Sequence, residues 1–293
     1  MPEKIPDKYQ PLKEIQTNHR FSTFEGLLEN KKVFIKFAVD PELKERLSIE
    51  ANGLRSMRQL DPNEMLYHVP SVIELTDDYI VTEWAEGAPM ADDFAQKNLV
   101  NVEYDLSYLV RLYSFIDQTV DTRVKMGDII ERAVDKHITN LKTLEYEKYV
   151  DKKLIDRLVE YIRANTESIE TRTTNGDLQP GNIMVAKNTK PTIIDCETYR
   201  DSWPRHYNIV NFVFNYGAEY PELLDKFRNM LDEYGQVINV NPSDDVVSFN
   251  FSAAMRSLQI IEERLSGDNF NSEIKDYVET SVLNILGGRL FTN

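Results

Sequence analysis

The sequence predicts an α+β chain, with a small β-rich part that contains one helix followed by a larger, mainly helical part. Alternating apolar residues mark strands near the start of the chain, whereas YLVRLYSFI and LIDRLVEYI further on have a helical period. A Gly/Pro cluster at residues 84–89 separates the two parts. We therefore predict domains at residues 1–86 and 87–293.

The small part opens with a hairpin over residues 22–39, divided by the polar run ENKK. Val33, Ile35 and Phe37 share one face of its second strand. Lys36 lies on the other face, and a lysine centred in so apolar a strand is unusual.

A helix is expected next, because Asp40 suits the N-cap and Pro41 the first helical position. Its apolar stripe consists of Leu43, Leu47, Leu54 and Met57. The missing member of this stripe is Glu50, and an acid in an apolar stripe needs a partner. A strand over residues 79–83 follows.

The larger part is expected to be helical over residues 102–169. Residues 173–195 then return to short strands around turns, IMVA and TIID among them. The rest of the chain is helical again, with breaks at Pro242 and Gly267.

Composition narrows the function classes. The 293 residues carry a formal net charge of -15, which repels nucleic acid and anionic lipid, so neither is an expected partner. A cationic substrate is compatible with this charge. The single cysteine, Cys196, excludes an intrachain disulfide and a thiolate zinc cluster. No apolar run approaches the roughly 18 residues of a membrane span, and the polar start lacks a signal-peptide pattern, so a cytoplasmic protein is expected.

The densest group of reactive side chains lies at residues 175–197. Asp177 stands in a turn, Asn182 follows five positions later, and Asp195 ends an apolar strand. Phosphoryl transfer needs a carboxylate to orient the acceptor hydroxyl, oxygen ligands for Mg²⁺ and a cation for the phosphates. These three residues suit the first two needs and Lys36 the third, with Glu50 as the partner that holds Lys36.

This pattern resembles the protein-kinase-like superfamily, and within it the aminoglycoside phosphotransferase and choline kinase branch. That branch has a His-Gly-Asp-Leu-x-x-x-Asn loop followed by an Ile-Asp-x-Glu strand end. The match runs in order from Lys36 to Asn208. It implies a bilobal protein-kinase-like fold with a small β-rich N-lobe and a larger, mainly helical C-lobe. It also implies ATP-dependent transfer of the γ-phosphoryl group to a hydroxyl of a small molecule.

The resemblance assigns a role to each matching residue. Lys36 is similar to the lysine that contacts the α- and β-phosphates, and Glu50 to its ion-pair partner. Asp177 is similar to the catalytic base, and Asn182 and Asp195 to the two Mg²⁺ ligands.

The resemblance also implies how the nucleotide is held. Thr82 takes the gatekeeper place, and the backbone of Glu83 and Ala85 would bond the base edge. Phe34 takes the place of an aromatic ring that stacks on adenine, and Ser22 could reach the phosphates.

Each assignment has a structural alternative. Asp177 and Asn182 are common residues of ordinary turns, and Lys36 would also suit an edge strand. Glu50 would also suit a solvated helix face. Glu197 is expected either near the metal or as a support behind it.

The sequence departs from the family pattern in three places. Residues 16–25, QTNHRFSTFE, contain no glycine, where protein kinases have a Gly-rich phosphate cover. Asn175 replaces the usual histidine, and Asn208 takes the place of an acid. Because an amide can both donate and accept, our hypothesis is that a neutral Asn pair replaces a charged brace of the catalytic loop.

Other functions stay open. A protein kinase is disfavoured, because only thirteen positions separate Asp195 from Asn208 and no Ala-Pro-Glu occurs. A pseudokinase, a nucleotide-binding module with weak or no catalysis, is the alternative from another class. The charge favours an aminoglycoside- or choline-like acceptor over sugars, macrolides and homoserine-like alcohols, and the acceptor pocket is expected in residues 88–170 and 200–293. GTP is not excluded as the donor, and a monomer or a homodimer is expected.

Overall fold

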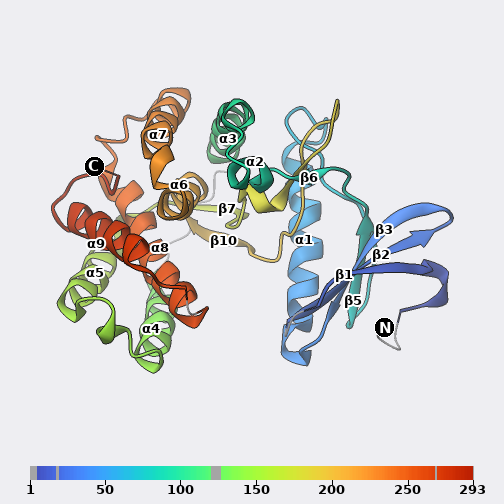
Figure 1. The fold of residues 1–293 in the computed structure, drawn as a ribbon, viewed down its shortest axis with the longest axis horizontal. Helices are drawn as coiled ribbons and strands as arrows, with labels where there is room; N and C mark the ends of the chain where they lie inside the picture. The colour runs from blue at the N-terminus through green and yellow to red at the C-terminus, as the bar shows by residue number, and fades with distance from the viewer. Residues whose placement is uncertain (1–4, 18–19, 120–126, 268, 293) are drawn as a thin grey trace. The chain divides into compact units, whose positions relative to one another are not determined.

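The computed structural model describes residues 5–17, 20–119, 127–267 and 269–292 (Figure 1). Contacts divide the chain into two compact units, Met1–Leu99 with Thr174–Arg200, and Val100–Thr173 with Asp201–Asn293. The segment with the candidate catalytic residues therefore belongs to the same unit as the N-terminal strands. The domain boundary near Gly87 follows chain order alone and stays a prediction.

The first unit contains a five-stranded antiparallel sheet with the order β1-β2-β3-β5-β4. Its strands are β1 (Pro11–Thr17), β2 (Phe21–Leu28), β3 (Lys31–Ala38), β4 (Val72–Leu75) and β5 (Tyr79–Glu83). The predicted hairpin is confirmed as β2 and β3. Its turn is Glu29-Asn30, with φ of 51° and 66°. Two positive φ values give the two-residue turn whose twist matches that of the flanking strands.

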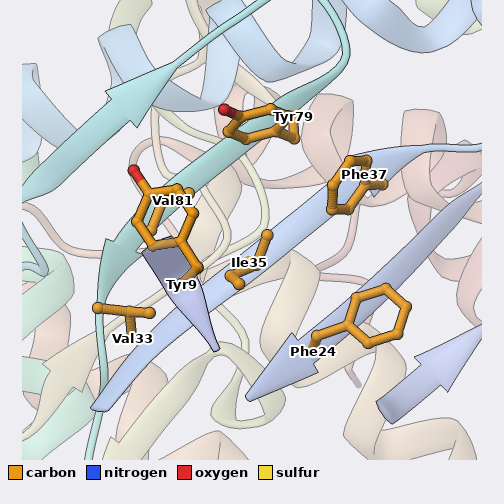
Figure 2. Packing of buried hydrophobic residues seen from close by; sticks show 7 residues of the cluster. All are labelled: Tyr9, Phe24, Val33, Ile35, Phe37, Tyr79 and Val81. Carbon is orange, nitrogen blue, oxygen red and sulfur yellow. The ribbon is translucent and has the colours of Figure 1, made fainter. Parts of the chain in front are cut away.

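One face of this sheet carries a hydrophobic core (Figure 2). The core consists of Tyr9, Phe24, Val33, Ile35, Phe37, Tyr79 and Val81. The three residues predicted to share one face of β3 therefore do so, and that face is the buried one. Lys36 alternates to the opposite face, where it lies across from Thr23 on β2 and Ile80 on β5.

Helix α1 (Lys44–Leu60) begins later than predicted. Residues Pro41–Leu43 form a separate 3₁₀ turn, η2, and the Asp40 carboxylate accepts from the Glu42 N–H at 2.9 Å. Asp40 thus caps η2 rather than α1, because its side chain reaches the backbone only two residues on. The predicted stripe is confirmed for Leu47, Glu50, Leu54 and Met57, which α1 buries, whereas Leu43 lies in η2 and is half-buried.

The end of α1 is fixed by the buried carboxylate of Asp61. It accepts the N–H groups of Met65 (2.8 Å), Leu66 (2.7 Å) and Tyr67 (3.4 Å). Burial alone would raise the pKa of Asp61, but these backbone donors outweigh it and lower the pKa. The charged carboxylate is therefore the form that stabilises this turn.

We expect Asp61→Ala to lower the free energy of unfolding by about 2–3 kcal/mol, because buried N–H groups lose their acceptor. A lowered native pKa gives stability that is present above the unfolded value, near pH 4, and is lost as the pH falls through the native pKa. Urea unfolding of the wild type and Asp61→Ala measures the loss, and unfolding of the wild type and Asp61→Asn at several pH values measures its pH dependence. The gap between them should close in acid, whereas exposed Asp77→Asn should leave stability nearly unchanged; a gap independent of pH would contradict it.

Two smaller sheets involve the segment around residue 180. One has the order β6-β8-β9, with β6 (Ala88–Pro89), β8 (Ile183–Val185) and β9 (Thr192–Ile193). The other pairs β7 (Thr171–Asn175) with β10 (Tyr199–Pro204). The short strands predicted here are confirmed, but β10 was not predicted, because YRDSWP has no apolar alternation. A short helix, α2 (Ala91–Ala95), follows β6.

The second unit is mainly helical. Its helices are α3 (Leu99–Thr119), α4 (Gly127–Thr143), α5 (Lys152–Asn165), α6 (Tyr207–Glu219), α7 (Leu224–Ile238), α8 (Val246–Ser266) and α9 (Ser272–Leu286). Helix α8 is central and packs against α4, α5, α6 and α9. The predicted breaks at Pro242 and Gly267 are confirmed, since they lie before and after α8. Within the described part of the chain, no helix has the length and apolar character needed to cross a bilayer.

Candidate active site

The ammonium of Lys36 is the centre of an ion cluster inside the first unit. Its Nζ lies 2.8 Å from Glu50 Oε2, 3.2 Å from Asp195 Oδ1 and 3.3 Å from Glu197 Oε2. The Lys36 and Glu50 side chains are only 7% and 5% exposed, whereas that of Asp195 is 37% exposed. The inner end of the cluster, formed by Lys36 and Glu50, is therefore buried, and its outer end at Asp195 is open to solvent.

The surrounding carboxylates keep Lys36 protonated. Burial alone would lower the pKa of Lys36, but the three surrounding carboxylates outweigh burial and raise it. Burial raises the pKa of Glu50 despite the opposing effect of Lys36. Burial would also raise the pKa of Glu197, but Lys36 and Arg20 outweigh it and lower that pKa. Lys36 is thus a permanent cation that each neighbouring carboxylate contacts directly.

Gly53 brings α1 close to the segment that carries Asp195 and Glu197. A Cβ at position 53 would lie 2.7 Å from the Cβ atoms of Cys196 and Tyr199, and 2.8 Å from the Cys196 carbonyl oxygen. Only glycine allows this approach without a shift. Since Glu50 lies one turn before Gly53 on the same helix, the close packing also sets the distance between Glu50 and Asp195.

We expect Gly53→Ala to destabilise the protein by about 1–3 kcal/mol through overpacking. In a free helix the same change would stabilise by about 1 kcal/mol, so the sign of the effect distinguishes overpacking from helix propensity. Thermal unfolding measures it, with the exposed neighbour Asn52→Ala as the matched control. An increase in Tm for Gly53→Ala would contradict the close packing.

The loop between β7 and β8 is organised by two asparagines. Asn182 Nδ2 donates to both the backbone oxygen and Oδ2 of Asp177, each at 2.9 Å. Asn175 is fully buried; its Nδ2 donates to the Asp195 carbonyl at 3.2 Å, and its Oδ1 accepts from the Asp177 N–H at 3.4 Å and from the Thr198 hydroxyl. A neutral amide at position 175 therefore ties the Asp177 loop to the Asp195 segment.

Asp195 itself has a left-handed backbone, with φ of 54°. Such a conformation is uncommon for a residue other than glycine, although aspartate tolerates it better than most. The backbone is held nearby, since the Ile194 N–H donates to the Asn182 carbonyl at 2.9 Å and Ile193 pairs with Ile183. These bonds place the Asn182 backbone beside the segment that ends in Asp195.

The side chains of Asn182 and Asp195 carry oxygen atoms of the kind that Mg²⁺ binds. Because Nδ2 of Asn182 is used on Asp177, a metal would be bound by its Oδ1. Amide and carboxylate oxygens are ligands that Mg²⁺ accepts, usually with water and substrate phosphates completing its shell. The described residues include no group of three or more His, Cys, Asp or Glu that could hold a metal, so a closed all-carboxylate site is not present there.

Comparison with known proteins gives the fold. No family model matches the sequence, and no curated protein is significantly similar to it. Among solved structures, a thermostable mutant of aminoglycoside phosphotransferase APH(4)-Ia in complex with ADP and hygromycin B is 10% identical, with a TM-score of 0.65 and coverage of 96% of this chain and 94% of that chain.

Two further structures agree. Choline kinase LicA from Streptococcus pneumoniae is 12% identical, with a TM-score of 0.55 over 95% of this chain and 92% of that chain. Spectinomycin phosphotransferase APH(9)-Ia, in complex with ADP and spectinomycin, is 14% identical, with a TM-score of 0.52 over 94% and 87%. The chain has the aminoglycoside phosphotransferase fold. The predicted fold class is therefore confirmed.

Within the aminoglycoside phosphotransferase fold, the expected nucleotide-contact residues are distributed unevenly. Phe34 and Thr82 are cross-strand partners on β3 and β5, on the same face of the sheet as Lys36. The Glu83 N–H donates to the Ser71 carbonyl at 3.0 Å, and Ala85 follows β5 in irregular backbone. Phe34 and Thr82 thus lie on the Lys36 face of the sheet, Glu83 pairs with Val33 of the opposite face, and contact of any of these residues with a base stays a prediction.

Ser22 is not brought to the Lys36 cluster. It pairs with Phe37, so it lies on the opposite face of the sheet from Lys36, and its Oγ accepts from the Thr17 hydroxyl at 2.9 Å. A single residue of strand phase decides the face, and contact of Ser22 with a phosphate stays a prediction.

Three contributors to the cluster were missed or underweighted from sequence. Arg20 pairs with Glu197 Oε1, and Arg46 Nη1 lies 3.4 Å from the same oxygen. The Phe21 ring lies 4.4 Å from the Lys36 ammonium. An arginine in a polar loop carries no periodic signal, so only the spacing of Glu197 behind Asp195 pointed towards this group.

Proposed function

We propose that this protein transfers the γ-phosphoryl group of ATP to a hydroxyl group of a small molecule. The observation that carries the proposal is the 3.2 Å contact between Lys36 Nζ and Asp195 Oδ1, two residues 159 positions apart. The Asp177–Asn182 bond supports it, because it joins the proposed base to the proposed metal ligand at 2.9 Å.

Each residue then has a role in the reaction. Lys36 binds the α- and β-phosphates, and Glu50 holds the lysine in place. Asn182 and Asp195 would hold Mg²⁺, which neutralises charge on the phosphates. Positioning and electrostatic stabilisation supply most of the catalysis in this reaction class.

Asp177 acts on the acceptor. It orients the hydroxyl and accepts its proton while the hydroxyl oxygen bonds to the γ-phosphorus. The bond from that phosphorus to the β–γ bridging oxygen breaks, and ADP leaves with the electron pair.

The similar solved structures support a small-molecule acceptor, since they include enzymes crystallised with hygromycin B or spectinomycin and a choline kinase. An amine-bearing acceptor also agrees with the net charge of -15, because the field of the protein attracts cations. We further propose a cytoplasmic location, a monomer or homodimer, and ATP as the donor.

A coupled ADP-release screen over amino-alcohols, aminoglycosides, macrolides and sugars tests the proposal. We expect acceptor-dependent ADP release that is lost in Asp177→Ala. Equal ADP release by both proteins would mean that it comes from a contaminant. Nucleotide binding without turnover on any acceptor would instead favour the pseudokinase function.

A further inference from the structure

We infer that Arg20 is a phosphate-binding residue that takes over the function of the missing Gly-rich loop, an inference that rests on the proposed function. Arg20 lies directly before β2, within the glycine-free segment at residues 16–25. Backbone N–H groups of a Gly-rich loop can approach a phosphate closely because glycine has no side chain. A loop without glycine needs another donor, and a guanidinium is suited to that task.

The geometry brings Arg20 and Lys36 to one place. Arg20 Nη2 contacts Glu197 Oε1, while Lys36 Nζ lies 3.3 Å from Oε2 of the same carboxylate. Both cations also lie near the ring of Phe21, at 5.3 Å for the Arg20 guanidinium carbon and 4.4 Å for the lysine nitrogen. Two independent neighbours thus place the guanidinium beside the ammonium proposed to bind phosphate.

Exposure separates the two cations. The Lys36 side chain is 7% exposed, whereas that of Arg20 is 37% exposed. A triphosphate that reaches Lys36 from the solvent side would therefore meet the accessible guanidinium as well. The guanidinium has five N–H donors, so it can bind a phosphate oxygen while it still contacts Glu197.

Three cations meet at Glu197, since Lys36, Arg20 and Arg46 all contact its carboxylate. Lys36 is also paired with Glu50 and Asp195, so the three cations are matched by three carboxylates. Arg46 also reaches Glu197, but from α1 and at the longer distance of 3.4 Å, which makes it the matched comparison.

Binding of AMP-PNP and adenosine with Mg²⁺, measured by calorimetry on the full chain, tests the inference. We expect Arg20→Ala to weaken AMP-PNP by about tenfold, as for loss of one hydrogen bond to a charged group, and to leave adenosine unchanged. Arg46→Ala should weaken AMP-PNP less. Arg55→Ala, on the exposed side of α1, should change neither affinity and controls for net charge.

The outcomes separate this inference from the proposed function. If Arg20→Ala changes both ligands equally or neither, Arg20 only supports Glu197 and the inference falls. If Lys36→Ala weakens AMP-PNP while Arg20→Ala does not, the inference falls and the proposed function stands. If the wild type binds no AMP-PNP, both fall. Arg20→Lys keeps the charge but not the planar guanidinium, so its loss of AMP-PNP affinity should be intermediate. Circular dichroism spectra check that each variant is folded. A loss equal to that of Arg20→Ala would mean that the geometry of the guanidinium, and not charge alone, makes the phosphate contact.

Discussion

Replacement of Lys36 with methionine is expected to lower the free energy of unfolding by about 3–5 kcal/mol. Methionine keeps most of the apolar stem but removes the charge. Glu50 is then left buried, and among the described residues Lys36 is its only ion-pair partner. Glu197 is less affected, because Arg20 and Arg46 still contact it.

A double-mutant cycle identifies the cause of this loss. Glu50→Gln removes the stranded charge, so Lys36→Met with Glu50→Gln should be more stable than Lys36→Met alone. Urea unfolding of the four proteins gives the coupling energy, with Lys31→Met on the exposed end of β3 as control. Additive effects would show that Lys36 and Glu50 do not interact as the structure describes.

Replacement of Asp177 with asparagine is expected to lower kcat by about 10²–10⁴-fold, the usual contribution of a positioned general base. Asparagine keeps the shape of the side chain and an oxygen that can accept from Asn182, so the loop should stay intact. It cannot take the acceptor proton.

Steady-state kinetics with the best acceptor of the screen measures the effect, while nucleotide affinity and Tm should stay at wild-type values. Asn182→Asp serves as the contrast, because it adds a charge beside the metal position and should change the magnesium dependence as well. A wild-type kcat for Asp177→Asn would exclude Asp177 as the base.

Much of the candidate site could be predicted from the sequence. The sequence predicts an ion pair of Lys36 and Glu50, because each is a charged residue in an apolar pattern and burial of an unpaired charge is costly. The segment from Asp177 to Asp195 is predicted as a site because turn residues and a short hairpin follow one another at close spacing.

The rest depended on three-dimensional detail that periodicity does not carry. Ser22 lies on the face of the sheet opposite to Lys36, and only strand phase decides this. The close approach at Gly53 is invisible in the sequence, since a helical glycine alone does not identify its neighbour. Arg20 was overlooked because a lone loop arginine is usually solvated, and only its contact with Glu197 places it in the cluster.

The predicted neutral brace of Asn175 and Asn208 is supported by the contacts of Asn175 only. Its hydrogen bonds to the Asp177 N–H and the Asp195 carbonyl agree with a neutral brace for the loop. The suggested partnership with Asn208 stays a prediction. Comparing turnover of Asn175→His, Asn208→Asp and the double mutant tests it, because additive effects would argue against coupling.

Transfer of the phosphoryl group can be followed directly with an isotope label. The protein is incubated with Mg²⁺, a panel acceptor and ATP that carries ¹⁸O on the γ-phosphate, and the acceptor is then analysed by mass spectrometry. We predict a phosphorylated acceptor that retains the label, formed at least about a hundredfold more slowly with Asp177→Asn. Label found only in inorganic phosphate or in unchanged ATP, for every acceptor, would contradict it.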